Sequence, residues 1–234
     1  MILIAGDSWG CGCWDTNQKV YHRGLEQYLH DNGHNVINLS GGGSCLEETT
    51  QVLGNFLRQI QLSPWLWMPE PITKVFVFQT EWNRGGGFDH LLNPAQRELL
   101  KFKNQGDDQK IIASFYSTLS YFAIEYNVDI QIIGGCSDTI YIDNFEKHYP
   151  GVSIACQSFT NLLVNDNHRI DNPVFSVRFP PQLIKDEHTI QLAQLGQERE
   201  KVWQANPDWM YPDGGHPNHL GHKKLYEHIK GVLT

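Results

Sequence analysis

A serine that directly follows an apolar run is the first feature of this sequence that could do chemistry. Residues 2–5 are apolar, and they are followed by Gly6, Asp7 and Ser8, with a second glycine at Gly10. A serine in this place presents its hydroxyl at the end of a buried strand. Such a hydroxyl is a poor nucleophile unless a neighbouring base takes its proton. Ser8 is therefore a candidate nucleophile, and the other interpretation is a turn serine that caps the next segment.

A candidate base lies near the other end of the chain, where Asp213 precedes His216 by three residues. An aspartate at this spacing can turn back and hold the second ring nitrogen of the histidine. That contact fixes the tautomer and stabilises the imidazolium during proton transfer. Pro217 suits the first turn of a closing helix. Ser8, His216 and Asp213 thus form a hypothetical triad, and the alternative for the pair is an Asx turn with a histidine at a helix start.

Strand-like and helix-like segments alternate along the chain. Apolar runs predict strands at residues 2–5, 35–39, 74–78, 129–133 and 152–155. Helical spacing of apolar residues predicts helices at about 21–29, 46–60, 94–102, 111–126, 187–203 and 217–232. In the last of these, Leu220, Leu225, Ile229 and Val232 form the expected inner face. This alternation indicates a mostly parallel sheet with helices on both faces, whose ligands bind beyond the carboxyl ends of the strands.

Three blocks of the sequence occur in the order found in a known family. Gly-Asp-Ser8 resembles the nucleophile block of the SGNH (GDSL-type) hydrolases, and the stretch from Asn38 to Ser44 resembles their glycine block. Gly43 aligns best with the oxyanion-hole glycine, although it also suits a tight turn. The stretch from Asp213 to Pro217 resembles the Asp-x-x-His block. The resemblance implies one α/β domain over residues 1–234, with three α/β/α layers and a flavodoxin-like parallel sheet of about five strands.

The resemblance also implies an activity. Members of the family are serine esterases and other acyl hydrolases that form an acyl-enzyme and use no cofactor. We expect cleavage of a small-molecule ester, of the carboxylesterase or carbohydrate O-deacetylase type. The oxyanion would be held by the backbone N–H groups of Ser8 and Gly43 and by one side-chain donor. Insertions at residues 84–108 and 139–186 would shape the pocket for a small polar ester or an acylated carbohydrate.

One block departs from the family pattern. The third strand usually ends in Gly-x-Asn-Asp, and the register here puts Glu81 at the position of the asparagine donor. A carboxylate there would repel the oxyanion, and loss of one donor costs about 10²–10³ in rate. Either Asn83 or Gln79 supplies the donor, or Glu81 turns away to pair with Arg84, or the site mainly binds. The last possibility makes a catalytically weak or inactive ligand- or partner-binding protein the alternative function.

Other residues near the expected site have weaker claims. His216, His219 and His222 are spaced by three and could suggest a metal site. Because Pro217 puts His216 at or before the helix start, we expect no metal, and we expect solvated or capping positions for the other two. Trp9 and Trp82 are weak candidates for substrate contact, as is Arg84, which could instead pair with Glu81 or Asp89. Trp14, Trp65 and Trp67 are expected in core and loop packing.

Composition excludes several classes of protein. The chain has 234 residues, 40% of them hydrophobic, and a net charge of −8, which disfavours general binding to nucleic acid or to an anionic membrane. No apolar run approaches the ~20 residues of a membrane span. Five cysteines and no basic leader indicate reduced thiols and a cytoplasmic protein. Cys11 and Cys13 are alternative nucleophiles, but neither has the strand-end position of Ser8.

Overall fold

The computed structural model describes most of the core and part of the loops. The described residues are 1–15, 20–63, 70–80, 108–135, 138–139, 142–164, 201, 204–205, 208–209 and 216–233. Of the predicted helix at 187–203 only residue 201 is described, and it is helical. The predicted helix at 94–102 lies outside the described residues, as do 84–107 and 165–186, which are nearly all of the first expected insertion and nearly half of the second. No helix in the described part of the chain has the length and hydropathy to cross a membrane.

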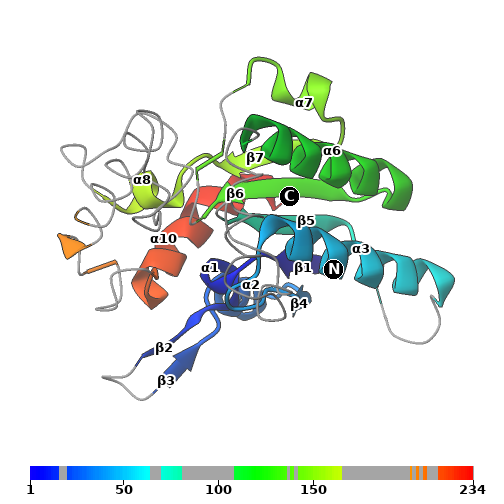
Figure 1. Cartoon of the computed structure of the whole chain (residues 1–234). Coiled ribbons are helices and arrows are strands. Elements are labelled where there is room, and N and C mark those ends of the chain that lie inside the picture. The colour runs from blue at the N-terminus through cyan, green and yellow to red at the C-terminus, as the bar shows by residue number, and fades with distance from the viewer. Residues whose placement is uncertain are drawn as a thin grey trace, which may run out of the picture.

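A five-stranded parallel sheet forms the centre of the molecule (Figure 1). Its strands are β1 (Ile2–Ala5), β4 (Val36–Asn38), β5 (Lys74–Gln79), β6 (Asp129–Gly134) and β7 (Val152–Cys156). They lie in the order β4-β1-β5-β6-β7, which is the flavodoxin-like order. The predicted fold class is therefore confirmed. The edge strand β7 falls within the interval 139–186, so that part of the expected insertion belongs to the sheet.

Alternate residues of the central strands point to opposite faces of the sheet. On one face Leu3, Val75 and Val77 pack in a core with α3 (Leu46–Leu62) and α6 (Asp108–Tyr126). Figure 1 shows these two helices along the same side of the sheet, and they contact each other. Both helices were predicted, because their apolar residues recur at helical spacing.

The opposite face carries a second core. Ile4, Phe76 and Phe78 pack there with residues of three helices, which are α2 (Leu25–Asp31), α8 (Phe159–Leu163) and α10 (His219–Ile229). Because both faces are covered, the sheet is the middle of three layers. A short helix, α7 (Phe145–His148), precedes β7.

The segment after β1 differs from the prediction. A short helix, α1 (Ser8–Cys11), is followed by an antiparallel hairpin of β2 (Cys13–Asp15) and β3 (Val20–His22), which projects from the body of the molecule (Figure 1). Tyr21 therefore lies in a strand and not in the helix predicted from about residue 21. The helix α2 starts only after Gly24, because the φ of +61° at this residue is not helical and favours glycine.

The last helix begins later than predicted. Asn218 is the N-cap of α10, and its Oδ1 accepts a hydrogen bond from the backbone N–H of Gly221 at 3.0 Å. Pro217 and His216 therefore precede the helix. The inner face is also shifted, because Leu220 is 42% exposed whereas Leu225 and Ile229 are buried. The chain continues in a 3₁₀ turn, η4 (Lys230–Val232).

Candidate active site

The structure brings together two of the three predicted triad residues. The Nε2 atom of His216 lies 2.8 Å from the Oγ atom of Ser8, across 208 positions of sequence. Both side chains are half-buried. This is the distance at which a neutral imidazole accepts the hydroxyl proton. A serine nucleophile requires an adjacent base, and this contact has the geometry that such a pair needs.

The turn before Ser8 is fixed by a close approach to the neighbouring strand. Gly6 has a φ of +149°, and a Cβ atom at this position would lie only 2.7 Å from the Cβ of Phe78 in β5. Only glycine fits both the conformation and the space. The turn then leads into α1, so Ser8 stands at the carboxyl end of β1, as the sequence predicted.

Asp7 holds this turn through its buried carboxylate. One carboxylate oxygen accepts a hydrogen bond from the backbone N–H of Trp9 at 3.0 Å, which caps α1. The other accepts from the hydroxyl of Thr80 at 2.7 Å. Asp7 and Thr80 are both fully buried. Neither role was predicted, although the sequence shows an aspartate next to the candidate nucleophile and a threonine directly after a strand.

The glycine-rich loop after β4 is hydrogen-bonded to the nucleophile turn. Asn38 donates from Nδ2 to the carbonyl oxygen of Gly10 at 2.9 Å and accepts from the N–H of Ser40 at 3.0 Å. The N–H of Gly41 donates to the carbonyl oxygen of Gly6 at 3.0 Å. Asn38 thus has a structural role at the end of β4. Gly43 is exposed, with a φ of +85° that favours glycine; its oxyanion role stays a prediction.

Gln79 is not available as the third oxyanion donor. Its side chain is fully buried, and Nε2 donates to the carbonyl oxygen of Asp138 at 2.6 Å. Its Oε1 accepts from the hydroxyl of Tyr116 at 2.7 Å. Because both ends of the amide are engaged inside the protein, the interpretation that Gln79 binds the oxyanion is wrong. Asn83 is the remaining candidate donor from the sequence analysis.

A second histidine of the C-terminal group is buried beside the site. His222 is only 1% exposed, and its ring packs edge-on against Phe78 and Phe159. The expectation that it is solvated or capping is therefore wrong. Burial, together with the charges of His22 and His216, lowers the pKa of His222 to about 3. His222 is neutral at pH 7.

Burial argues against two predictions near Ser8, which are a substrate contact by Trp9 and a nucleophile role for Cys11. Trp9 is 1% exposed and packs against Phe159 with ring centroids 5.6 Å apart, so it is a core residue, and this argues against a substrate contact. Burial, together with the charge of Asp7, raises the pKa of the Cys11 thiol. A thiol with a raised pKa is a poor nucleophile at neutral pH.

Several predicted site residues lie outside the described part of the chain. They are Asp213, Glu81, Trp82, Asn83 and Arg84. Their roles therefore remain predictions. Within the described ranges, no group of three or more histidine, cysteine, aspartate or glutamate side chains is arranged to hold a metal ion.

Among comparisons with known proteins, only the search of solved structures finds similar chains. A scan against models of protein families finds no match, and a search of curated proteins finds none either. Among solved structures, the psychrotrophic esterase EstA from Pseudoalteromonas sp., inhibited by monoethylphosphonate, is 16% identical with a TM-score of 0.44. That match covers 99% of this chain and 97% of the esterase. TesA is 18% identical with a TM-score of 0.40, over 100% of this chain and 97% of TesA.

Proposed function

We propose that this chain is a single-domain serine hydrolase of the SGNH type that cleaves a small-molecule ester through an acyl-enzyme. The observation that carries the proposal is the 2.8 Å contact between the Oγ atom of Ser8 and Nε2 of His216. Ser8 also stands beyond the carboxyl end of a strand in a parallel sheet of flavodoxin-like order, where such sheets bind ligands.

The first half of the proposed reaction acylates the serine. His216 takes the proton of the Ser8 hydroxyl as the oxygen attacks the ester carbonyl carbon, which gives a tetrahedral oxyanion. When this intermediate collapses, the bond to the alkoxide breaks, and the imidazolium of His216 returns the proton to the leaving alcohol. In this mechanism Asp213 accepts a hydrogen bond from the Nδ1–H of His216 and holds the productive tautomer.

The second half hydrolyses the acyl-enzyme. A water molecule gives its proton to His216 and attacks the acyl carbon, and the second tetrahedral intermediate then releases the acid as Ser8 regains a proton. In both halves we assign the backbone N–H groups of Ser8 and Gly43 to the oxyanion, with Asn83 as the side-chain donor. The hydrogen bonds from Asn38 and Gly41 to the nucleophile turn support this assignment, since they keep the two loops in register.

We propose a small polar ester, such as an acetylated carbohydrate, as the substrate. The support is compositional, because the segment 84–108, which comes after the third strand of the sheet, is polar and glycine-rich. A wide apolar cleft for a long acyl chain is not expected from such a segment. Hydrolysis of sugar acetates should therefore exceed hydrolysis of long-chain esters, which a comparison of kcat/KM for the two substrate groups measures.

The proposal is tested by hydrolysis of p-nitrophenyl acetate. Ser8→Ala and His216→Ala should each lower kcat by at least about a thousandfold, because the pair acts as one unit. Ser117→Ala, an exposed serine on α6, is the matched control and should keep wild-type kcat. Equal activity of Ser8→Ala and the control would contradict the proposal.

The alternative function, a binding protein with little turnover, rests on Glu81 at the expected donor position. If an ionised Glu81 opposes the oxyanion, Glu81→Asn should raise kcat by about tenfold or more, because a repulsive group is replaced by a donor. If Glu81 is turned away and Asn83 is the donor, Asn83→Ala should lower kcat by about 10²–10³. Tight binding of an ester without turnover by the wild-type protein would favour the binding function.

A further inference from the structure

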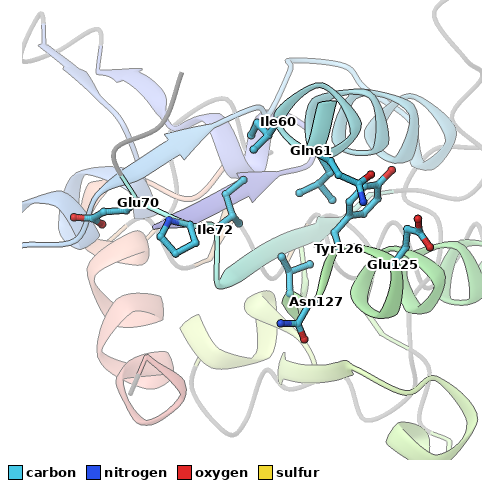
Figure 2. Close-up of a pocket in the computed structure, with 10 residues that line it drawn as sticks. Ile60, Gln61, Glu70, Ile72, Glu125, Tyr126 and Asn127 are labelled. Atoms are coloured by element: carbon cyan, nitrogen blue, oxygen red, sulfur yellow. The ribbon is translucent and has the colours of Figure 1, made fainter. Parts of the chain in front are cut away.

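A hollow of about 470 Å³ lies at the end of the sheet opposite Ser8 (Figure 2). Its walls come from the last turns of α3 and α6 and from the segments that lead into the amino ends of β5 and β6. The strands are parallel, so this edge is separated from the candidate active site by the length of the sheet. Its lining residues include Leu57, Ile60, Ile72, Tyr126 and Val128.

The floor of the hollow is apolar. Leu57 and Val128 are buried members of the first core, and Ile72 and Tyr126 pack against that core as half-buried residues. Figure 2 shows Ile60, Ile72 and the ring of Tyr126 around the hollow. Its volume lies within the ~300–1,000 Å³ of small-molecule sites. An organic group of moderate size would displace water from this surface on binding.

The electrostatic character of the hollow is negative. The helices α3 and α6, of 17 and 19 residues, both end at it, and neither has a basic residue in its last turn. Helix C-termini carry partial negative charge and favour cations. The lining contains two carboxylates, Glu70 and Glu125, and no basic side chain. Two helix C-termini and two carboxylates, one of which is partly neutralised by the N-terminal ammonium, therefore meet at one apolar hollow.

Two cations near the hollow are already paired, one of them with the lining residue Glu70. The N-terminal ammonium donates to the carbonyl oxygen of Pro71 at 2.8 Å and lies 3.8 Å from Glu70, which it partly neutralises. Lys74 lies 3.1 Å from the carboxylate of Asp129 and also donates to the carbonyl oxygen of Val232. Among the described residues Glu125 has no ion-pair partner, and it adjoins Tyr126 on the rim (Figure 2).

We infer that this hollow is a binding site for a small organic cation, an ammonium group carried on an apolar aryl or alkyl body. The body lies on Leu57, Ile72 and Val128. The ammonium lies towards Glu125 and the open carbonyls at the end of α6, where the ring of Tyr126 adds a cation–π contact. The site is independent of the proposed hydrolysis, and none of its lining residues takes part in that mechanism.

The test uses the full chain, nuclear magnetic resonance and three matched probes. In low salt, ¹H–¹⁵N spectra are followed while 3-phenylpropylammonium, 3-phenylpropan-1-ol or 3-phenylpropionate is added. The ammonium should give saturable shifts at backbone amides of lining residues such as Ile60 and Val128. The neutral alcohol should bind about tenfold more weakly, and the carboxylate should cause no saturable shifts. Equal affinity for ammonium and alcohol, or shifts mapping beside Ser8, would overturn the inference.

Two exposed positions allow variants that keep the fold. Glu125→Gln should weaken binding of the ammonium by about twofold to fivefold and leave the alcohol unchanged, because one exposed charge is removed. Gln61→Lys places a cation at the end of α3 and should abolish ammonium binding. Glu47→Gln, at the other end of α3, is the matched control and should bind like wild type. Unchanged binding in both Glu125→Gln and Gln61→Lys would contradict the inference.

Discussion

At the scale of single residues, Asp7 holds the turn that positions the candidate nucleophile Ser8. Its carboxylate joins the start of α1 to Thr80 at the end of β5 through two hydrogen bonds. Thr80 immediately precedes the segment in which the third oxyanion donor is expected. Asp7 therefore links the nucleophile turn to the chain that carries the donor, and we regard it as a positioning residue.

The isosteric change Asp7→Asn tests this role. The amide can keep one accepted hydrogen bond but presents N–H groups to the other donor, so Ser8 should shift slightly. We expect kcat for p-nitrophenyl acetate to fall about tenfold to a hundredfold with little change in KM, since small misplacements of reacting groups are costly. Thr80→Val should have a smaller effect in the same direction. The effect of the double variant should be smaller than the product of the single effects, because the two residues share one contact.

If Asp7 were only structural, the result would differ. Asp7→Asn would then lower the melting temperature and the fraction of active protein, while kcat per active site would stay at the wild-type value. Titration of active sites with a covalent probe separates these outcomes.

The candidate nucleophile and base were predictable from the sequence, but their support was not. Ser8 and His216 were recognisable because each lies in a short block with its neighbours. Gln79 was wrongly kept as a possible donor, because sequence gives no sign that Tyr116 and the Asp138 backbone engage its amide. Burial of Trp9 was likewise invisible, since an aromatic residue in a loop and one in a core look the same in sequence.

At the scale of elements, the close approach of the turn after β1 to the parallel neighbour β5 depends on Gly6. Gly6→Ala would need a φ near +149° and would place its Cβ 2.7 Å from the Cβ of Phe78. Strain and overpacking each cost about 1–3 kcal/mol, so the free energy of unfolding should fall by about 2–6 kcal/mol.

A glycine in the neighbouring loop supplies the control for this prediction. A Cβ on Gly42 meets no atom within 4 Å, and its φ lies outside the left-handed region. Gly42→Ala should change the free energy of unfolding by less than about 0.5 kcal/mol. Urea denaturation of both variants measures the difference, and similar losses in both would refute the role assigned to the Gly6 contact.

The packing of α10 predicts a pH dependence of stability. The pKa of His222 is about 3 in the folded protein against 6.5 as its ordinary value. Between these values the unfolded chain binds a proton that the folded chain excludes, so stability is complete above pH 6.5 and falls as pH decreases towards 3. The slope from this one group reaches about 1.4 kcal/mol per pH unit.

A variant at this position isolates the contribution. In His222→Leu, the number of protons taken up on unfolding between pH 4 and 6 should fall by about one. The slope of the free energy of unfolding against pH should fall accordingly, whatever the effect of the substitution on overall stability. Leu225→Ala, in the same helix, should lower stability by about 2–5 kcal/mol at every pH and leave the slope as in wild type. An unchanged slope in His222→Leu would show that the ring is not kept neutral by burial.

Long periodic elements were predicted well, and short ones near the site were not. The helices α3 and α6 and the strands β1, β5 and β6 have strong patterns, because one face or both faces are buried. The hairpin of β2 and β3 was missed, since Tyr21 fits a helical face with Leu25 and Tyr28 as well as it fits a strand. The burial of His222 was missed because a histidine on a helix reads as polar, and only packing against Phe78 and Phe159 reveals its surroundings.

At the scale of the whole molecule, the site joins the two ends of the chain. Ser8 follows the first strand and His216 precedes the last helix, and each is held by a different part of the second core. The pair therefore exists only when the sheet and the helices α2 and α10 are assembled. Local structure around Ser8 alone cannot supply the base.

This dependence predicts that reactivity and folding are lost together. In urea, the rate at which Ser8 reacts with a fluorophosphonate should fall with the same midpoint as the circular-dichroism signal. The free cysteines Cys45 and Cys156, which are buried in the folded protein, offer an internal reference, since their modification should begin at that midpoint. Loss of Ser8 reactivity at a clearly lower urea concentration would mean that the site opens before the fold does.

The most direct test of the Ser8–His216 couple is intact-mass analysis after exposure to a fluorophosphonate, with peptide mapping of the adduct. Wild-type protein should gain one adduct, located on Ser8, and Ser8→Ala and His216→Ala should gain none under the same conditions. Circular dichroism confirms that each variant is folded. Folded wild-type protein without an adduct, or an adduct that persists in Ser8→Ala, would contradict an activated serine at this site.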